Sequence, residues 1–187
     1  VDDFDLSSLI DIGAGGAARP EDQVQSLHDK FNLPLTFGWG MTETCALGAI
    51  NRGDEYLAKP NSSGLNVPYL TQVAVTDENW NFLNTGEVGE IVFKSPTNMI
   101  GYLKNEEETK KALKDGWLLT GDLGYIDDEG YLFIVDRKKS LIIRGGENIS
   151  TLEVENALDR HANILESCVC GIDDPKFGEI VGAYIYC

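Results

Sequence analysis

The spacing of apolar residues changes twice along this chain of 187 residues, and each change restricts the folds that it can adopt. Residues 1–50 contain two short apolar runs, "SSLIDIG" and "LPLTFGW", on either side of the helically spaced "PEDQVQSLHDKF". From 51 to 137, glycine and asparagine interrupt short alternating runs such as "TQVAVTD" and "GYLFIVDR", which indicate β-structure. Residues 138–187 then have the order β-α-β-β. The pattern predicts a strand-helix-strand portion, a mainly β portion, and the beginning of a second, smaller domain.

Local signals support these elements. Asn105 is a suitable N-cap for a helix in "NEEETKKALK", and Ser150 with Glu153 has the spacing of a capping box. The run "IDDEGY" predicts a hairpin turn in which Gly130 takes a left-handed conformation. We expect residues 51–137 to form a small distorted β-barrel or sandwich. The predicted fold class is therefore α/β followed by α+β.

Charge and cysteine content narrow the range of functions. The chain has 15 basic and 31 acidic residues and a formal net charge of −16, which argues against nucleic acid as a partner. Its four cysteines include no C-x-x-C pair, and two histidines are too few for a zinc site with them. A reducing, cytoplasmic location is expected. No apolar run reaches the roughly 20 residues of a membrane span. The chain starts at Val1 and stops inside the strand-like "EIVGAYIYC", so we expect it to be part of a longer protein.

The stretch "FGWGMTETCAL", residues 37–47, places a tryptophan between two glycines and a carboxylate in an otherwise apolar run. Gly38 and Gly40 remove side chains from both flanks of Trp39, which predicts a slot where a planar group can stack. Thr42 offers a hydroxyl and Glu43 a hard oxygen ligand, which suits a phosphate and its Mg²⁺. The structural alternative is a buried tryptophan with incidental neighbours.

A glycine-rich run, "GAGGAA", lies between the first strand and the first helix. It matches G-x-G-x-x-A, but Arg19 and Pro20 delay the helix that a dinucleotide fingerprint requires at its glycines. The run is better interpreted as a tight turn, or as a glycine loop that lets a flat ligand ring approach the backbone.

Three further motifs are weak signals when each is considered alone, because each has a simple structural interpretation. In "DGWLLTGDLG", Asp122 follows a predicted Thr-Gly turn and could bind a ribose diol or cap the turn. In "VDRKKS", Arg137 comes directly after an apolar strand and could be a surface cation. The "RGGENIS" run could be simply the entry to a capped helix.

Taken together, the ordered motifs "GGAA", "GWGMTE", "TGD" and "DRKKSLIIRGGENISTLEVENAL" resemble those of the adenylate-forming superfamily. This superfamily includes acyl-CoA synthetases, firefly luciferase and the adenylation domains of peptide synthetases. The resemblance covers essentially the whole chain, and "WGMTET" and "IIRGGENIS" are most similar to bacterial medium- and long-chain fatty-acyl-CoA synthetases. It implies that residues 1–137 are the C-terminal part of the AMP-binding N-terminal domain, and that 138–187 are part of the C-terminal domain.

The resemblance also implies a reaction: a carboxylate is joined to AMP from MgATP, and the acyl group then passes to coenzyme A. On the adenine side, Gly15, Gly16 and Ala17 would lie along the ring. Trp39, followed by Gly40, would stack against it. Most relatives carry tyrosine where this chain has Trp39.

The other implied contacts involve the phosphates and the sugar. Thr42 would contact the phosphate and Glu43 would help to hold Mg²⁺, which makes them the candidate catalytic residues. Asp122 and Arg137 would bind the ribose hydroxyls, and Ile134 would pack near the sugar.

The C-terminal portion carries the implied thioester-forming elements. Lys139 falls at the hinge about which the small domain swings between an adenylating and a thioester-forming pose. Gly145 and Gly146 would face the active site in the second pose and leave room for the pantetheine arm of coenzyme A.

Two elements of the superfamily are not found in these 187 residues. One is the Ser/Thr/Gly-rich phosphate loop that ends in Pro-Lys-Gly, expected before Val1. The other is the catalytic lysine, expected after Cys187, because Lys176 has the wrong sequence context. We therefore expect the 187-residue chain alone to lack adenylation activity.

The sequence leaves three functions open. The favoured one is part of an ATP-dependent fatty-acyl-CoA synthetase, whose partners are a carboxylic acid, ATP and coenzyme A, and which could contact membranes to collect its lipid. The second is an aryl-CoA ligase or a carrier-protein adenylation domain of the same superfamily. The third is a non-catalytic nucleotide-binding module.

Overall fold

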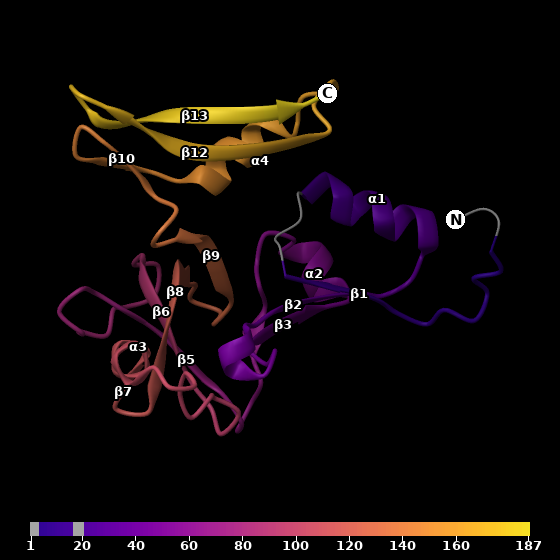
Figure 1. Ribbon diagram of the computed structural model, residues 1–187. Helices are drawn as coiled ribbons and strands as arrows, with labels where there is room; N and C mark the ends of the chain where they lie inside the picture. The colour runs from indigo at the N-terminus through magenta and orange to yellow at the C-terminus, as the bar shows by residue number, and fades with distance from the viewer. Residues whose placement is uncertain (1–3, 17–20) are drawn as a thin grey trace.

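The computed structural model describes residues 4–16 and 21–187, and the predicted adenine-side residue Ala17 lies outside them. Three sheets follow one another along the chain (Figure 1). The first has the order β1-β2-β3-β4, with β1 and β2 parallel and the other pairs antiparallel. Its strands are β1 (Ile12–Gly15), β2 (Leu35–Trp39), β3 (Ala49–Arg52) and β4 (Leu65–Asn66).

Two helices cover the first sheet, α1 (Glu21–Phe31) and α2 (Asp54–Ala58), as Figure 1 shows. Val24 of α1 is buried against Leu35 and Phe37 of β2, and Leu27 packs against the same cluster. The Phe37 ring stacks on Tyr56 of α2 with a centroid distance of 5.8 Å. The strand-helix-strand prediction is confirmed, although the first strand begins at Ile12, after most of the predicted "SSLIDIG" run.

The second sheet is antiparallel and five-stranded, and a short helix, α3 (Glu106–Ala112), precedes its strand β7. Its strands are β5 (Gln72–Thr76), β6 (Gly89–Lys94), β7 (Leu113–Lys114), β8 (Trp117–Ile126) and β9 (Leu132–Arg137). The predicted cap is confirmed, because Asn105 Oδ1 accepts a hydrogen bond from the Glu108 N–H at 3.2 Å. Gly130 has φ +87° in the predicted hairpin turn.

The Thr-Gly turn predicted before Asp122 is wrong. Thr120 and Gly121 both lie inside the ten-residue strand β8. Gly121 has φ +73°, a conformation that glycine adopts without the steric cost that a side chain would bring. The glycine therefore distorts the strand where the sequence suggested a reversal of the chain.

Buried polar groups join the first two sheets. The Asn51 side-chain amide donates to the backbone oxygens of Lys59 at 3.0 Å and Ser62 at 3.3 Å. The Ser62 hydroxyl in turn donates to the Leu132 carbonyl of β9 at 3.0 Å. Ala49, Ile91 and Leu132 form a shared apolar cluster from β3, β6 and β9. The two sheets therefore meet through one continuous core.

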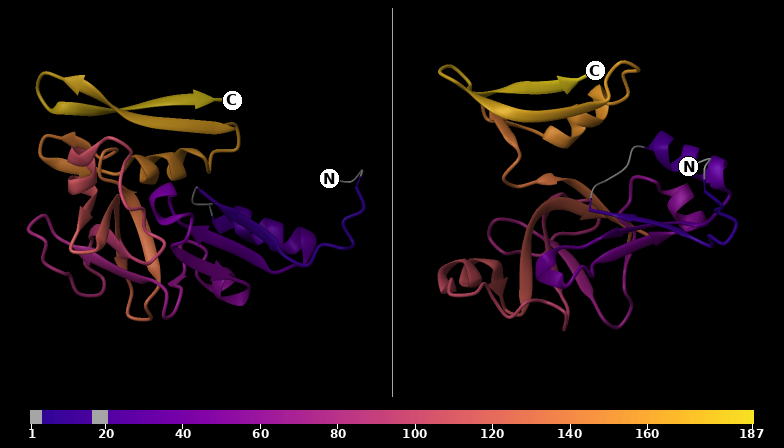
Figure 2. Two further views of the ribbon diagram at one scale, coloured as in Figure 1. Left: turned by 60° about the horizontal axis from the view of Figure 1, so that its bottom comes forward. Right: turned by 45° about the vertical axis from the view of Figure 1, so that its right-hand side comes forward.

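The third sheet forms a separate layer that follows the second sheet through residues 138–141 (Figures 1 and 2). Its order is β11-β10-β13-β12, and helix α4 (Thr151–Leu158) packs against β12. The strands are β10 (Ile142–Arg144), β11 (Glu147–Ile149), β12 (Glu166–Asp174) and β13 (Gly178–Tyr186). The predicted helix cap is confirmed on the serine side, because Ser150 Oγ accepts from the Glu153 N–H at 3.1 Å. Among the described residues, no helix has the length and apolarity needed to span a membrane.

A charged contact also links the end of α2 to the β8–β9 hairpin. Lys59 Nζ lies 2.5 Å from Asp127 Oδ2 and 2.8 Å from Glu129 Oε1, and 4.5 Å from the centre of the Tyr131 ring. Hydrogen bonds to Asp127 and Glu129 raise the pKa of Lys59 to about 12. Burial alone would raise the pKa of Asp127, but hydrogen bonds from Lys59 and from the Tyr131 N–H outweigh it, so this pKa is lowered.

We predict that Lys59→Met lowers the melting temperature, and that the loss depends on pH. The raised pKa of Lys59 makes its contribution complete below its ordinary value of 10.5, and the contribution is lost as pH rises to about 12. The lowered pKa of Asp127 makes its contribution complete above 3.8, and this is lost as pH falls below that value. Thermal unfolding of both proteins should therefore differ most between about pH 5 and pH 10. Lys110→Met, in an exposed pair, is the control; a Lys59→Met difference that does not change with pH would contradict the prediction.

Candidate functional site

Three predicted site residues meet where the first two sheets join. Asp122 of β8 accepts a hydrogen bond on Oδ2 from Trp39 Nε1 of β2 at 2.9 Å. Its Oδ1 lies 3.1 Å from Arg137 Nε of β9. The Asp122 side chain is only 7% exposed, whereas that of Arg137 is 71% exposed. We call these three residues the Asp122 cluster, a buried carboxylate held by one indole N–H and one guanidinium.

A β-bulge in strand β9 determines which of its side chains lie on the same face as Asp122. Asp122 pairs with Arg137, and Gly124 pairs with Ile134, so Val135 is the extra residue on β9. Residues three apart on a regular strand point to opposite faces, but the extra residue brings Ile134 and Arg137 to the same face as Asp122. The predicted residue Ile134 therefore packs against the Ala49–Ile91–Leu132 cluster on the same side of the sheet.

Trp39 is half-buried and belongs to the core as much as to a surface. Its ring meets Phe93 edge-on, with centroids 6.1 Å apart, and packs against the Ala49–Ile91–Leu132 cluster. The predicted reason for Gly40 needs correction: a Cβ there would lie 2.4 Å from the Ala46 backbone oxygen. Gly40 is required by a close approach of the chain to itself. A Cβ on Gly38 would meet only the Ala49 oxygen, at 3.8 Å.

The glycine run ends beside this site. Gly15 closes β1 and lies opposite Gly38, the residue before Trp39, in the parallel pairing of β1 with β2. Gly16 follows directly, with φ +89°. The carboxyl ends of neighbouring parallel strands are where open α/β sheets bind ligands. The structure thus brings Gly15, Gly16 and Trp39 to one end of the first sheet.

Thr42 and Glu43 lie on a short 3-10 helix, η1 (Thr42–Thr44), that follows β2. Thr42 is exposed and Glu43 is half-buried. Glu43 Oε1 accepts a hydrogen bond from the Tyr102 hydroxyl at 2.8 Å, and the Glu43 carbonyl accepts one from the Met99 N–H at 2.7 Å. The hydrogen bond to Glu43 is the main reason why the pKa of Tyr102 is raised.

Glu43 could hold Mg²⁺ only with ligands from elsewhere. Among residues 4–16 and 21–187, no group of three or more His, Cys, Asp or Glu side chains could enclose a metal ion. Mg²⁺ is usually bound by one or two carboxylates together with substrate phosphates and water. One carboxylate beside the exposed Thr42 hydroxyl fits an ion that arrives with a nucleotide. Tyr102 could not be predicted from the sequence, because its contact with Glu43 spans 59 residues and no local pattern signals it.

The predicted hinge residue Lys139 is exposed and lies in the turn after β9. Its neighbour Lys138 is attached to the second sheet, through its N–H to the Gly121 carbonyl at 2.8 Å and its Nζ to Glu90 at 3.0 Å. The third sheet contacts β9 again at the start of α4. There the Thr151 N–H donates to Asp136 Oδ2 at 2.7 Å.

Gly145 and Gly146 form the turn between β10 and β11, where the Gly145 N–H donates to the Phe177 carbonyl at 2.7 Å. Within the described part of the chain, no hydrogen bond or ion pair joins this turn to the Asp122 cluster. The structure therefore does not bring the predicted coenzyme A residues to the predicted nucleotide residues.

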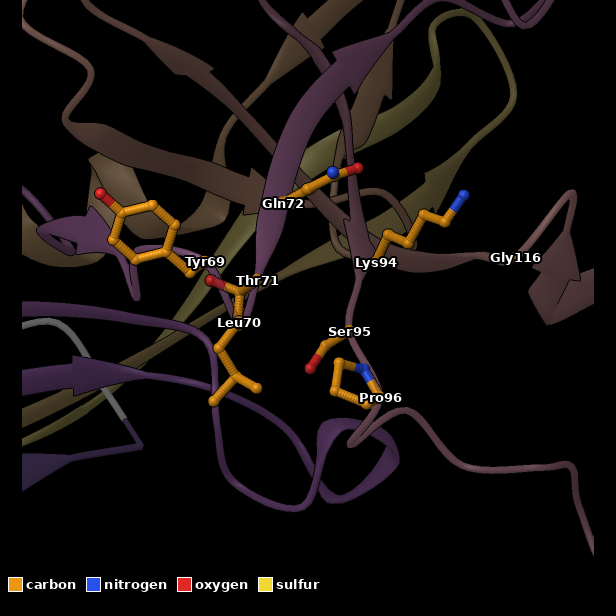
Figure 3. Close-up of a pocket in the computed structure, with 8 residues that line it drawn as sticks. All are labelled: Tyr69, Leu70, Thr71, Gln72, Lys94, Ser95, Pro96 and Gly116. Atoms are coloured by element: carbon orange, nitrogen blue, oxygen red, sulfur yellow. The ribbon is translucent and has the colours of Figure 1, made fainter.

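A cavity of about 430 Å³ lies at a different place, between the start of β5, the end of β6 and the turn before β8 (Figure 3). Residues around it include Tyr69, Gln72, Lys94 and Ser95. None of the predicted site residues lines it. The cavity is therefore separate from the Asp122 cluster and from the Thr42–Glu43 segment.

Comparison with known proteins agrees with these motifs. A family model described as "AMP-binding enzyme" matches residues 1–103, more than half of the chain. A 2-succinylbenzoate–CoA ligase of Bacillus licheniformis is 41% identical over 95% of this chain and 37% of its own length. A long-chain-fatty-acid–CoA ligase of Bacillus subtilis is 39% identical over 97% of the chain and 32% of its own length. The chain therefore spans about a third of the length of these curated relatives.

The fold class predicted from the sequence is confirmed by a solved structure. The o-succinylbenzoate CoA synthetase of Bacillus subtilis, in complex with an acyl-adenylate intermediate, matches with a TM-score of 0.87. It is 34% identical, and the match covers 94% of this chain and 36% of that one. The same synthetase is also known in complex with ATP and a magnesium ion.

The contact between Asp136 and the start of α4 should help to hold the third sheet against β9. Asp136→Ala removes the acceptor of the Thr151 N–H, so the third sheet should separate from β9 more often. Hydrogen bonds to charged groups contribute about 1.5–3 kcal/mol, so trypsin should cut after Lys138 or Lys139 about tenfold faster. Asp173→Ala, which changes an exposed residue of the third sheet, is the control. Equal cleavage rates for Asp136→Ala and the unmodified chain would mean that this contact does not hold the third sheet.

Proposed function

The chain belongs to the AMP-binding enzyme family, and we propose that it supplies the adenosine-binding part of an AMP-forming acid–thiol ligase. The observation that carries this proposal is the Asp122 cluster, in which residues from three strands and two sheets converge on one buried carboxylate. The proposed reaction has two steps. A substrate carboxylate attacks the α-phosphorus of ATP and displaces pyrophosphate. The coenzyme A thiol then loses its proton to solvent, and its sulfur attacks the acyl carbon and displaces AMP.

Ribose binding is the best-supported part of the proposal. A carboxylate has about four acceptor positions, and Trp39 and Arg137 occupy one on each oxygen. One position remains on each oxygen of Asp122, which suits the two donors of a vicinal diol. Arg137 has further N–H donors beyond the one that faces Asp122, and its exposure lets them reach a ligand.

The adenine and phosphate contacts complete the proposed nucleotide site. Gly15 and Gly16 would lie along the adenine, and Trp39 would flank it, since they share one end of the first sheet. Thr42 would contact the phosphate, and Glu43, positioned by Tyr102, would be the carboxylate ligand of a Mg²⁺ ion bound with ATP. The ion would neutralise phosphate charge.

For the C-terminal part, we propose a hinge at Lys139 and a domain boundary between residues 137 and 138. Lys138 is attached to the second sheet, whereas Lys139 is exposed in the turn that follows, where a hinge residue could change its backbone conformation. Rotation of the third sheet about this point would carry Gly145 and Gly146 toward the nucleotide site. They would then line the path of the pantetheine arm.

Two classes of acid are candidates for the substrate. The sequence motifs favour a fatty acid, and a relative at 39% identity is a long-chain-fatty-acid–CoA ligase. An aryl acid is the second candidate, because a 2-succinylbenzoate–CoA ligase is 41% identical to the chain. Steady-state thioester formation by the complete protein, with decanoate, palmitate and 2-succinylbenzoate as competing acids, would separate the two.

The proposed ribose contact can be tested directly. Asp122→Asn replaces one acceptor oxygen by a donor and removes the charge that holds Arg137. We expect the dissociation constant for AMP, measured by calorimetry on the 187-residue chain, to rise at least tenfold, or about 1.4 kcal/mol. Asp173→Asn is the matched control on an exposed strand position. AMP binding that is unaffected by Asp122→Asn would rule out this carboxylate as the ribose acceptor.

A second test concerns catalysis. The chain contains no Pro-Lys-Gly phosphate loop, so the positioning that adenylyl transfer requires is not supplied by these residues. We expect no ATP–pyrophosphate exchange above background from the purified chain with fatty or aryl acids. Exchange that depends on both the acid and Glu43 would contradict this prediction.

A further inference from the structure

The strongest unexplained feature of the molecule is the hydrogen bond between Trp39 and Asp122. It joins residues 83 positions apart and links β2 of the first sheet with β8 of the second. A stacking role for Trp39 does not require this bond, because stacking uses the face of the ring and the bond uses its edge. The bond therefore suggests an additional role.

The two partners of Asp122 differ in how well they can orient it. The Arg137 side chain is 71% exposed, so it can take up other positions and is shared with water. The Trp39 ring packs against both Phe93 and the Ala49–Ile91–Leu132 cluster, which restricts the direction of its N–H. Trp39 is therefore the more rigid of the two donors.

Orientation matters for this particular carboxylate. Rotation about its Cβ–Cγ bond would turn both oxygens together and misalign the two remaining acceptor positions relative to a diol. A donor fixed on Oδ2 at 2.9 Å prevents that rotation. The Thr120 hydroxyl accepts from the Asp122 N–H at 3.1 Å and so orients the backbone, but it does not contact the carboxylate.

We propose that Trp39 is a positioning residue for ribose recognition. Its indole N–H fixes the Asp122 carboxylate so that each oxygen accepts from one of two vicinal hydroxyls, which makes binding selective for a ribonucleotide. This inference rests on the proposed function, since it assumes that Asp122 faces the sugar. It differs from stacking, because stacking favours ribose and dideoxyribose nucleotides equally.

The test compares AMP with 2′,3′-dideoxyadenosine 5′-monophosphate, which keeps the adenine and the phosphate but lacks both hydroxyls. Calorimetry on the 187-residue chain should give AMP at least a tenfold tighter dissociation constant. Trp39→Phe keeps an aromatic ring and removes the donor. It should weaken AMP binding about fivefold to tenfold and leave dideoxy-AMP binding within twofold, so that the preference nearly disappears.

Two further proteins keep the test decisive. Trp117→Phe removes an indole that packs near Phe82, away from Asp122, and should leave the preference unchanged. If Trp39→Phe does not fold, β-(3-benzothienyl)alanine at position 39 keeps the shape of the indole and lacks only its N–H. Its effect on the preference should equal that expected for Trp39→Phe.

The outcomes separate the inference from the function on which it rests. A preference for AMP that survives loss of the indole N–H would overturn the inference, and so would equal weakening of both nucleotides, which is the result of lost stacking. An unmodified chain that binds neither nucleotide, or binds both equally, would overturn the proposed ribose site and the inference with it.

Discussion

Burial of the Asp122 carboxylate is the constraint on which the junction of the first two sheets depends. A charge removed from water costs several kcal/mol unless nearby groups replace its hydration. Trp39 and Arg137 supply that replacement from two other strands, so the carboxylate can be buried only when β2, β8 and β9 are all in place. The bulge at Val135 and the irregular backbone of Gly121 lie on either side of this residue. The distortions of the second sheet therefore lie next to its buried charged group.

Prediction from the sequence succeeded for those features whose causes are local. The caps at Asn105 and Ser150 and the hairpin turn at Gly130 each depend on residues within four positions of one another. It failed where the cause is distant. The Thr-Gly pair before Asp122 has the composition of a turn, but pairing with β6 and β9 extends it into a strand. The second strand of the β10–β11 hairpin was missed for a similar reason, because "ENI" is too short and polar to be recognised without its partner.

In the candidate site, too, the individual residues could be predicted from local motifs, whereas the contacts between distant residues could not. The motifs named Trp39, Asp122 and Arg137 individually, and the structure brings them within hydrogen-bonding distance of one another. Their mutual contacts could not be predicted, because face alternation on β9 would have placed Ile134 opposite Arg137 and only the bulge brings them together. Nor could a local pattern show that Gly40 accommodates the Ala46 backbone, or that Tyr102 binds Glu43.

Strand β9 also connects the candidate site to the third sheet. Arg137 faces Asp122, whereas its neighbour Asp136 points to the opposite face and accepts from the Thr151 N–H of α4. Two adjacent residues on opposite faces of β9 therefore contact different parts of the molecule: Arg137 contacts Asp122 of the second sheet, and Asp136 contacts the start of α4. The proposed rotation of the third sheet about Lys139 would have to break this contact and the hydrogen bond from the Ser150 hydroxyl to the Val135 carbonyl at 3.2 Å. The attachment of Lys138 to Glu90 and Gly121 would keep Arg137 in place during that rotation. If the proposed rotation takes place, these contacts of Lys138 would let the third sheet move while the Asp122 carboxylate keeps its partners.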